Sequence, residues 1–308
     1  MKKRRRAIWF LAFLSVAGGY VGYLFGWRHG LPEAPPHTRV KPPLDKLPAL
    51  SVCWLETGKI FDNTGSSLLI RHPKGDLIVD AGNSSHFKDE LAPYSFGDRF
   101  WLRALPGALG PSLLLPAALT AAGADPAKVR LLVTHAHIDH VGGLMDLPST
   151  VPVLMAQPEI DWAAPGASSG VGVVPAHSAR LQGHMEPIVF SPTPYEVFDQ
   201  SADLFGDGGV VVVPLYGHTP GSVGVFVNIS PSLRLFHVGD AAHDWRGLEK
   251  RLSEPPVLAR TNWDTAKSEA VLSSLSAYHA AAPDVFMLPA HARQAWLRAF
   301  GEPTRCLH

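Results

Sequence analysis

Three histidines and an aspartate lie within six residues of the sequence, directly after a short apolar run. The run covers residues 129–133 and predicts a β-strand, and the polar side chains that follow it belong to His135, His137, Asp139 and His140. On a helix or a strand these side chains would point in different directions, so we expect a loop at the end of the strand, where they can converge. Imidazole nitrogens and carboxylate oxygens are the donors that a divalent ion such as zinc binds. The motif therefore predicts a metal site at the edge of a β-sheet.

Three further strands, in the second half of the chain, are each followed by another potential metal ligand. The strands expected at residues 210–216, 233–238 and 285–288 lead to His218, Asp240 and His291. Four strands that each end at a metal donor are a stronger indication than any single histidine. We therefore expect all of these side chains at the same sheet edge.

Taken together, these motifs resemble the metallo-β-lactamase superfamily over about residues 50–295; they read HAHIDH at 135–140, GHTPG at 217–221, GD at 239–240 and PAH at 289–291. The resemblance implies an α/β fold, an αββα sandwich of two mixed β-sheets flanked by helices, with the site at one edge between the sheets. It also implies two divalent metal ions, which we expect to be zinc. By this resemblance the first ion is held by His135, His137 and His218, the second by Asp139, His140 and His291, and Asp240 bridges both.

Within the superfamily, residues 239–291 look most like N-acyl homoserine lactonases and related lactone hydrolases. Those enzymes carry a tyrosine three residues after the bridging aspartate, and this chain has His243 there. Two interpretations of His243 stay open. It either replaces the phenol as a catalytic hydrogen-bond donor to the substrate carbonyl, or it is a supporting or surface histidine.

The resemblance implies a hydrolase that cleaves an ester, a lactone or a related acyl bond, with a hydroxide that bridges the two ions as the nucleophile. Asp139 lies between two ligands and is also placed to accept a proton from the nucleophile or to return one to the leaving group. Asp80 lies at the end of the apolar strand at residues 77–79. It either orients the metal loop, residues 134–140, by accepting hydrogen bonds from it, or caps its own loop. The alternative functions are a thioesterase resembling glyoxalase II and a non-catalytic metal-binding sensor domain.

Charge and cysteine content restrict the partners. Lysine and arginine together number 27, as do aspartate and glutamate, so the chain has no general basic field for nucleic acid. We expect a small acyl substrate and no nucleic acid, and the sequence leaves the oligomeric state open. Cys53 and Cys306 are too few for a thiolate cluster, and they either form one bridge between the ends of the domain or stay unpaired.

The N-terminus has the pattern of a membrane-targeting segment. Five basic residues at positions 2–6 precede the uncharged, mostly apolar run 7–27, which as a helix would reach about 30 Å, the thickness of a bilayer core. Residues 1–27 are therefore a signal anchor or a cleaved signal peptide, which places the remainder outside the cytoplasm, either membrane-anchored or secreted. Six prolines make residues 28–48 a stiff, proline-rich spacer. Residues 49–308 are then the hydrolase domain.

The sequence also predicts helices and loops around the strands. We expect helices at residues 112–123 and 265–280, the second with one apolar face. Residues 159–182 are predicted to be a loop, because they contain Pro165-Gly166 and Ser168-Ser169-Gly170.

Overall fold

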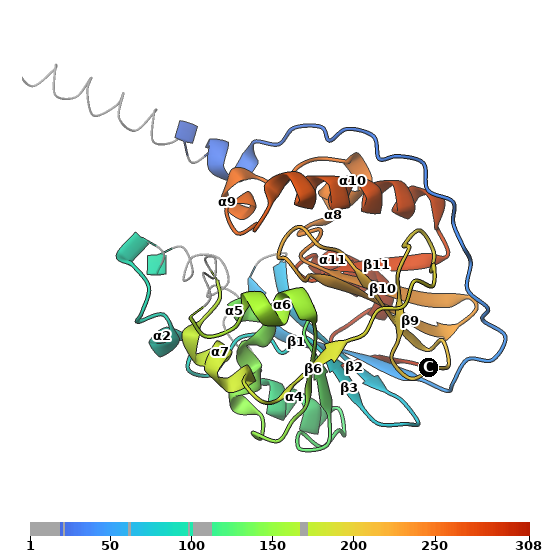
Figure 1. Cartoon of the computed structure of the whole chain (residues 1–308), viewed down its shortest axis with the longest axis horizontal. Helices are drawn as coiled ribbons and strands as arrows, with labels where there is room; N and C mark the ends of the chain where they lie inside the picture. Colours follow the sequence, from blue (N-terminus) through green and yellow to red (C-terminus); the bar gives the residue numbers. More distant parts are fainter. Residues whose placement is uncertain (1–18, 21, 61–62, 98, 101–112, 167–171) are drawn as a thin grey trace, which may run out of the picture.

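The computed structural model describes residues 19–20, 22–60, 63–97, 99–100, 113–166 and 172–308 (Figure 1). In this part of the chain the strands form two sheets, with the orders β12-β1-β2-β3-β4-β5-β6 and β11-β10-β9-β8-β7. The strands are β1 (Ser51–Ile60), β2 (Asn63–Arg71), β3 (Leu77–Val79), β4 (Arg130–Leu132), β5 (Val153–Ala156), β6 (Met185–Ile188), β7 (Ala202–Asp203), β8 (Val210–Pro214), β9 (Val223–Ser230), β10 (Leu233–Gly239), β11 (Val285–Pro289) and β12 (Cys306–Leu307). The helices are α2 (Phe87–Glu90), α4 (Leu115–Ala121), α5 (Ile138–Val141), α6 (Gln157–Trp162), α7 (Pro175–Leu181), α8 (Trp245–Lys250), α9 (Pro256–Ala259), α10 (Thr265–Ala281) and α11 (Arg293–Phe300).

Both sheets are mixed. Strands β3 to β6 run parallel to one another, whereas β1 pairs antiparallel with β2 and with β12. In the second sheet β10 is parallel to β11, and the pairs from β7 to β10 are antiparallel. Because β9 is antiparallel to both β8 and β10, the strands β8, β10 and β11 all point the same way. Their C-terminal ends therefore meet at one edge of the sheet.

Alternation along the strands produces three apolar layers. Along β1, Val52 and Trp54 face the layer between the two sheets, whereas Cys53 and Leu55 face the opposite side, against α4. The outer face of the second sheet packs against α10 through residues such as Phe236, and Figure 1 shows α10 lying along the outside of the molecule. The predicted sandwich of two mixed sheets covered by helices is thus confirmed. The two predicted helices are present as α4 and α10, but the buried side of α10 is not purely apolar, since it includes Ser268, Ser273 and Ser276.

The segment predicted to be a spacer packs on the domain. Arg28 forms an ion pair with Asp244, and Arg39 forms ion pairs with Glu196 and with Asp284, the latter at 2.7 Å between Nη1 and Oδ1. In Figure 1 this segment, drawn in blue, runs around the outside of the molecule. Glu196 is buried, whereas Asp244 and Asp284 are partly exposed. The proline-rich segment is therefore held against the domain by ion pairs at Arg28 and Arg39.

The predicted membrane segment lies mostly outside the described residues, which include only positions 19, 20 and 22–27 of it. Among the helices that the structure describes, we find none with both the length and the apolar character needed to cross a bilayer.

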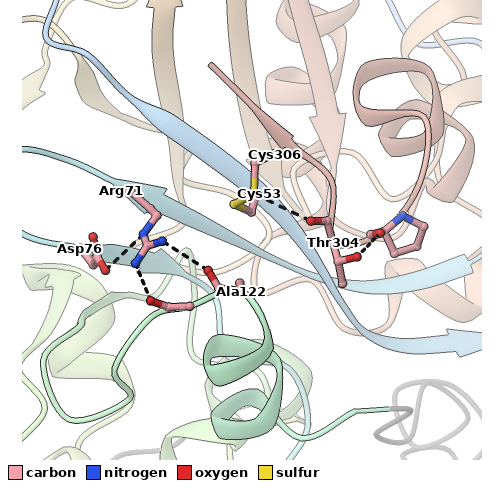
Figure 2. Close-up of a disulfide and its surroundings, with 8 residues drawn as sticks. Cys53, Arg71, Asp76, Ala122, Thr304 and Cys306 are labelled. Atoms are coloured by element: carbon pink, nitrogen blue, oxygen red, sulfur yellow. Dashed lines mark hydrogen bonds and ion pairs between the residues drawn. A yellow bond between two sulfur atoms is a disulfide. The ribbon is translucent and has the colours of Figure 1, made fainter.

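The two cysteines are joined. Cys53 on β1 and Cys306 on β12 are direct partners in the antiparallel pair and form a disulfide, with their Cα atoms 4.0 Å apart (Figure 2). The bridge attaches the C-terminal strand to the edge of the first sheet. The sequence left open whether the two cysteines form a bridge or stay unpaired, and in the structure they form the bridge.

The predicted loop at residues 159–182 is wrong in part. Helix α6 continues to Trp162, and α7 occupies Pro175–Leu181. Both helices have a proline in their first turn, where its missing N–H costs no hydrogen bond. The glycine- and serine-rich positions 167–171 lie outside the described residues.

Candidate metal centre

Every residue of the predicted ligand set follows the end of a strand. His135 and His137 lie on the loop after β4, and Asp139 and His140 lie in the one-turn helix α5. The expectation that a loop alone presents these four side chains is therefore corrected, since α5 begins at Ile138. The three remaining members come after β8, β10 and β11 and are His218, Asp240 and His291.

The side chains fall into overlapping groups whose donor atoms are all close together. His135, His137 and His218 form one group, and Asp139, His140 and His291 form another, with the donor atoms of each group within 4.8 Å of one another. In the first group Nε2 of His218 lies 2.9 Å from Nδ1 of His137. The two groups are the ones that the resemblance assigned to separate ions.

Asp240 lies between the groups, and its two oxygens face different histidines. Oδ2 lies 3.9 Å from Nε2 of His135 and 3.7 Å from Nε2 of His218. Oδ1 lies 3.3 Å from Nε2 of His140 and 3.2 Å from Nε2 of His291. A carboxylate in this position can bind one cation through each of its two oxygens.

The electrostatics of the site suit a divalent cation. Burial, reinforced by the neighbouring imidazoles, holds the pKa of His135 and of His137 well below the usual value, so both rings are neutral and offer lone pairs. Burial alone would raise the pKa of Asp240, but the surrounding histidines hold it well below its usual value. Among the described residues, Nε2 of His135, Nε2 of His140 and Oδ1 of Asp240 are buried without a hydrogen-bond partner. Buried polar atoms are almost always paired, so the convergence of these unpaired ones fits a site that binds a cation.

Asp80 holds the metal loop in place. Its carboxylate accepts hydrogen bonds from the backbone N–H and the hydroxyl of Thr134, each at 2.8 Å, and lies 2.8 Å from Nδ1 of His140. The last contact fixes the His140 ring with Nε2 toward Asp240, as a carboxylate partner does for a metal-binding histidine. Of the two sequence interpretations, the one in which Asp80 orients the loop is confirmed.

Glu159 connects two of the ligand loops, and the sequence gave no role to it. Its fully buried carboxylate accepts from the N–H of Ala136 at 2.7 Å, from the hydroxyl of Thr219 at 2.7 Å and from the N–H of Gly221 at 2.9 Å. Gly221 is required here, because a Cβ at this position would lie 2.3 Å from the Glu159 nitrogen. The sequence signal that could have drawn attention to Glu159 is Gln157-Pro158-Glu159, which is typical of a helix start and directly follows a strand.

Glu159 makes the stability of the metal-free protein depend on pH. Burial raises its pKa to about 7 from 4.5. The pKa of Glu159 is higher in the folded than in the unfolded chain, so the folded state holds this proton more tightly. The resulting contribution of Glu159 to the free energy of unfolding is complete below pH 4.5 and is lost as the pH rises through 7. The loss amounts to about 3 kcal/mol. Urea unfolding in EDTA between pH 4.5 and 8 should therefore show a steeper decline for the wild type than for Glu159→Gln. Equal slopes would contradict this assignment.

His243 lies inside the site. It is buried, its Nε2 lies 3.1 Å from Oδ2 of Asp240, and its Nδ1 contacts Oε1 of the buried Glu254. The interpretation of His243 as a surface residue is therefore excluded. Burial lowers the pKa of the ring, but Glu254 and Asp240 together raise it well above its usual value in the metal-free chain.

Comparison with known families agrees with this geometry. The model of the metallo-beta-lactamase superfamily matches residues 61–277, which is more than half of the chain. The chain belongs to the metallo-beta-lactamase superfamily. This superfamily match covers the strands from β2 to β10 and the ligand positions from His135 to Asp240, and it ends before β11 and His291.

Curated relatives within the superfamily include several lactonases. The N-acyl homoserine lactonase AttM of Agrobacterium fabrum is 26% identical over 234 residues, which cover 74% of this chain and 81% of that protein. AttM of Azorhizobium caulinodans is 29% identical over 181 residues, 57% of this chain and 64% of that protein, so this match spans less than two thirds of the relative.

Solved structures of the superfamily share the fold. An N-acyl homoserine lactone hydrolase with N-hexanoyl-L-homoserine at its catalytic metal centre has a TM-score of 0.58 at 17% identity, covering 86% of this chain and 99% of that one. The dizinc quorum-quenching lactonase AidC gives 0.54 at 14% identity, with 84% and 92% covered. At such low identity these matches establish the two-sheet fold alone.

Proposed function

We propose that this chain is a hydrolase of lactones or related esters that depends on two divalent metal ions, with zinc the expected metal. The observation that carries the proposal is the position of Asp240, whose two carboxylate oxygens face two separate groups of buried histidines. One cation in each group would share this carboxylate. The non-catalytic sensor is disfavoured because the relatives that match over most of their length are named as lactonases.

In this proposal each metal ion has its own set of ligands. His135, His137 and His218 would hold the first ion, Asp139, His140 and His291 the second, and Asp240 both. Two bound ions would supply a hydroxide nucleophile at neutral pH, by lowering the pKa of a water molecule to about 7, and would polarise the acyl carbonyl.

Asp139 has a second task in this proposal. It is the least enclosed member of the set, with its side chain 11% exposed, and its Oδ2 lies 3.5 Å from Nε2 of His291. A partly exposed carboxylate beside the second ion can accept a proton from the nucleophile and return it to the leaving alkoxide.

A location outside the cytoplasm fits the disulfide. Bridges such as Cys53–Cys306 persist in oxidising compartments and are rare in the reducing cytosol. The basic and apolar N-terminus of the sequence favours the same location. We therefore propose that the catalytic domain works outside the cytoplasm, anchored to the membrane or secreted.

Metal removal and substrate choice test the proposed function. Dialysis against a strong chelator should lower hydrolysis of a lactone by about 10³-fold or more, and adding back zinc should restore it. A panel of N-acyl homoserine lactones, thioesters and β-lactams, together with elemental analysis, would measure the preference. We expect lactones to be cleaved fastest; fastest turnover of thioesters would favour the glyoxalase II-like alternative. Hydrolysis that persists without metal would contradict the proposal.

A further inference from the structure

His243 lies where a metal ligand would lie. Its Nε2, Nε2 of His218 and a carboxylate oxygen of Asp240 form a buried group in which all donor atoms are within 4.8 Å of one another. Nε2 of His243 and Nε2 of His218 face the same oxygen, Oδ2 of Asp240, at 3.1 Å and 3.7 Å respectively. His243 is therefore on the side of Asp240 that belongs to the first ion.

The hydrogen bond at the other side of the ring sets its tautomer. Nδ1 of His243 contacts Oε1 of Glu254. A carboxylate accepts hydrogen bonds, so Nδ1 donates in this contact. Nδ1 of His243 therefore keeps its proton, and a ring that is deprotonated at Nε2 presents a lone pair there. That lone pair faces an anionic oxygen at 3.1 Å, so a cation or a proton has to lie between them.

Glu254 and Asn262 together support His243 and the predicted ligand His218. Asn262 donates from Nδ2 to Oε2 of Glu254 at 3.2 Å, and its Oδ1 lies 2.7 Å from Nδ1 of His218. Since the amide oxygen accepts from His218, both rings are held with Nδ1 outward and Nε2 inward. Partners of this kind orient metal-binding histidines and raise their basicity. Glu254 and Asn262 stand 11 and 44 residues after their histidine partners, so spacing could not reveal them.

We propose that His243 is an additional ligand of the first metal ion, oriented by the Glu254–Asn262 pair. This inference rests on the proposed metal-dependent function and deepens it. It replaces the interpretation of His243 as a hydrogen-bond donor to substrate, because a ring that binds a metal ion through Nε2 carries no proton on that nitrogen. A further imidazole makes the first site richer in nitrogen, which favours zinc over hard ions such as magnesium.

The test measures zinc affinity by competition with a chromogenic chelator in the purified full-length chain. His243→Phe keeps a ring of similar size but removes both nitrogens, and Glu254→Gln weakens the support of the ring. We expect the first zinc to bind about 10- to 100-fold more weakly in each variant. The matched control is His177→Phe, which also removes a buried histidine paired with a glutamate, Glu90, at 3.1 Å, but outside every donor group of the site.

A zinc-loaded crystal structure of the wild type gives a second measurement that does not depend on the variants folding. Ligation requires Nε2 of His243 at about 2.0–2.1 Å from zinc. Two bound ions with Nε2 beyond hydrogen-bond distance from both, or unchanged zinc affinity in His243→Phe, would overturn the inference and leave the proposed function intact. Ligation by His243 without turnover of any substrate in the panel would support the inference and overturn the proposed function. Failure of the wild type to bind metal would overturn both.

Discussion

Replacing Asp240 with alanine is expected to lower kcat/KM for lactone hydrolysis by about 10³-fold or more, because the ions would lose the carboxylate that they share and with it several kcal/mol of transition-state stabilisation. Five histidine nitrogens lie within 3.9 Å of this carboxylate, so its removal should also weaken binding of both metals. The measurement combines steady-state kinetics with the metal content of the variant after dialysis. Loss of activity should be accompanied by loss of metal.

The matched control is Asp161→Ala, which removes an exposed aspartate of α6 bonded to Gln157. A surface change of this kind should alter the free energy of unfolding by less than about 0.5 kcal/mol and leave turnover unchanged. Far-UV circular dichroism of metal-free Asp240→Ala separates loss of the site from loss of the fold. A folded Asp240→Ala protein that hydrolyses lactones at the wild-type rate would rule out the bridging role.

The strand ends were predictable because their signal is local. An apolar strand followed within a few residues by a metal donor can be recognised at His135, His218, Asp240 and His291 without any knowledge of packing. The shared direction of β8, β10 and β11 then places the ligands at one edge of the sheet, because the C-terminal ends of these strands lie together.

Apart from Asp80, which follows an apolar strand, the supporting residues were not predictable, because their roles exist only after packing. Glu159 connects Ala136 to Gly221, and these loops belong to different sheets. The buried place of His243 depends on Glu254, in a segment without any motif. The pairing of Cys53 with Cys306, 253 positions apart, likewise has no local signal, and neither do the partners of the proline-rich segment.

The disulfide is expected to stabilise the fold without taking part in the reaction. The bridge joins positions 253 residues apart, and closing so long a loop restricts the unfolded chain by up to about 5 kcal/mol in the chain-entropy model, with 2–5 kcal/mol usual on removal. The site lies at the other end of β1, because Thr64 of β2, the partner of Lys59 in β1, accepts from Nδ1 of His291 through its carbonyl at 2.9 Å. Cys53 lies seven residues before the end of β1, about 23 Å along the strand.

The double variant Cys53→Ala/Cys306→Ala should therefore lose about 2–5 kcal/mol in the free energy of unfolding measured with urea, while its kcat/KM and metal content under native conditions stay unchanged. A reductant should lower the unfolding midpoint of the wild type to about that of the double variant and should not affect the double variant itself. A wild-type midpoint that ignores the reductant, with both thiols titratable in the folded protein, would show that the bridge is absent. A double variant that is stable but inactive would instead show that the bridge supports the site, because Cys53 lies on β1, which pairs with the strand β2 that contacts His291.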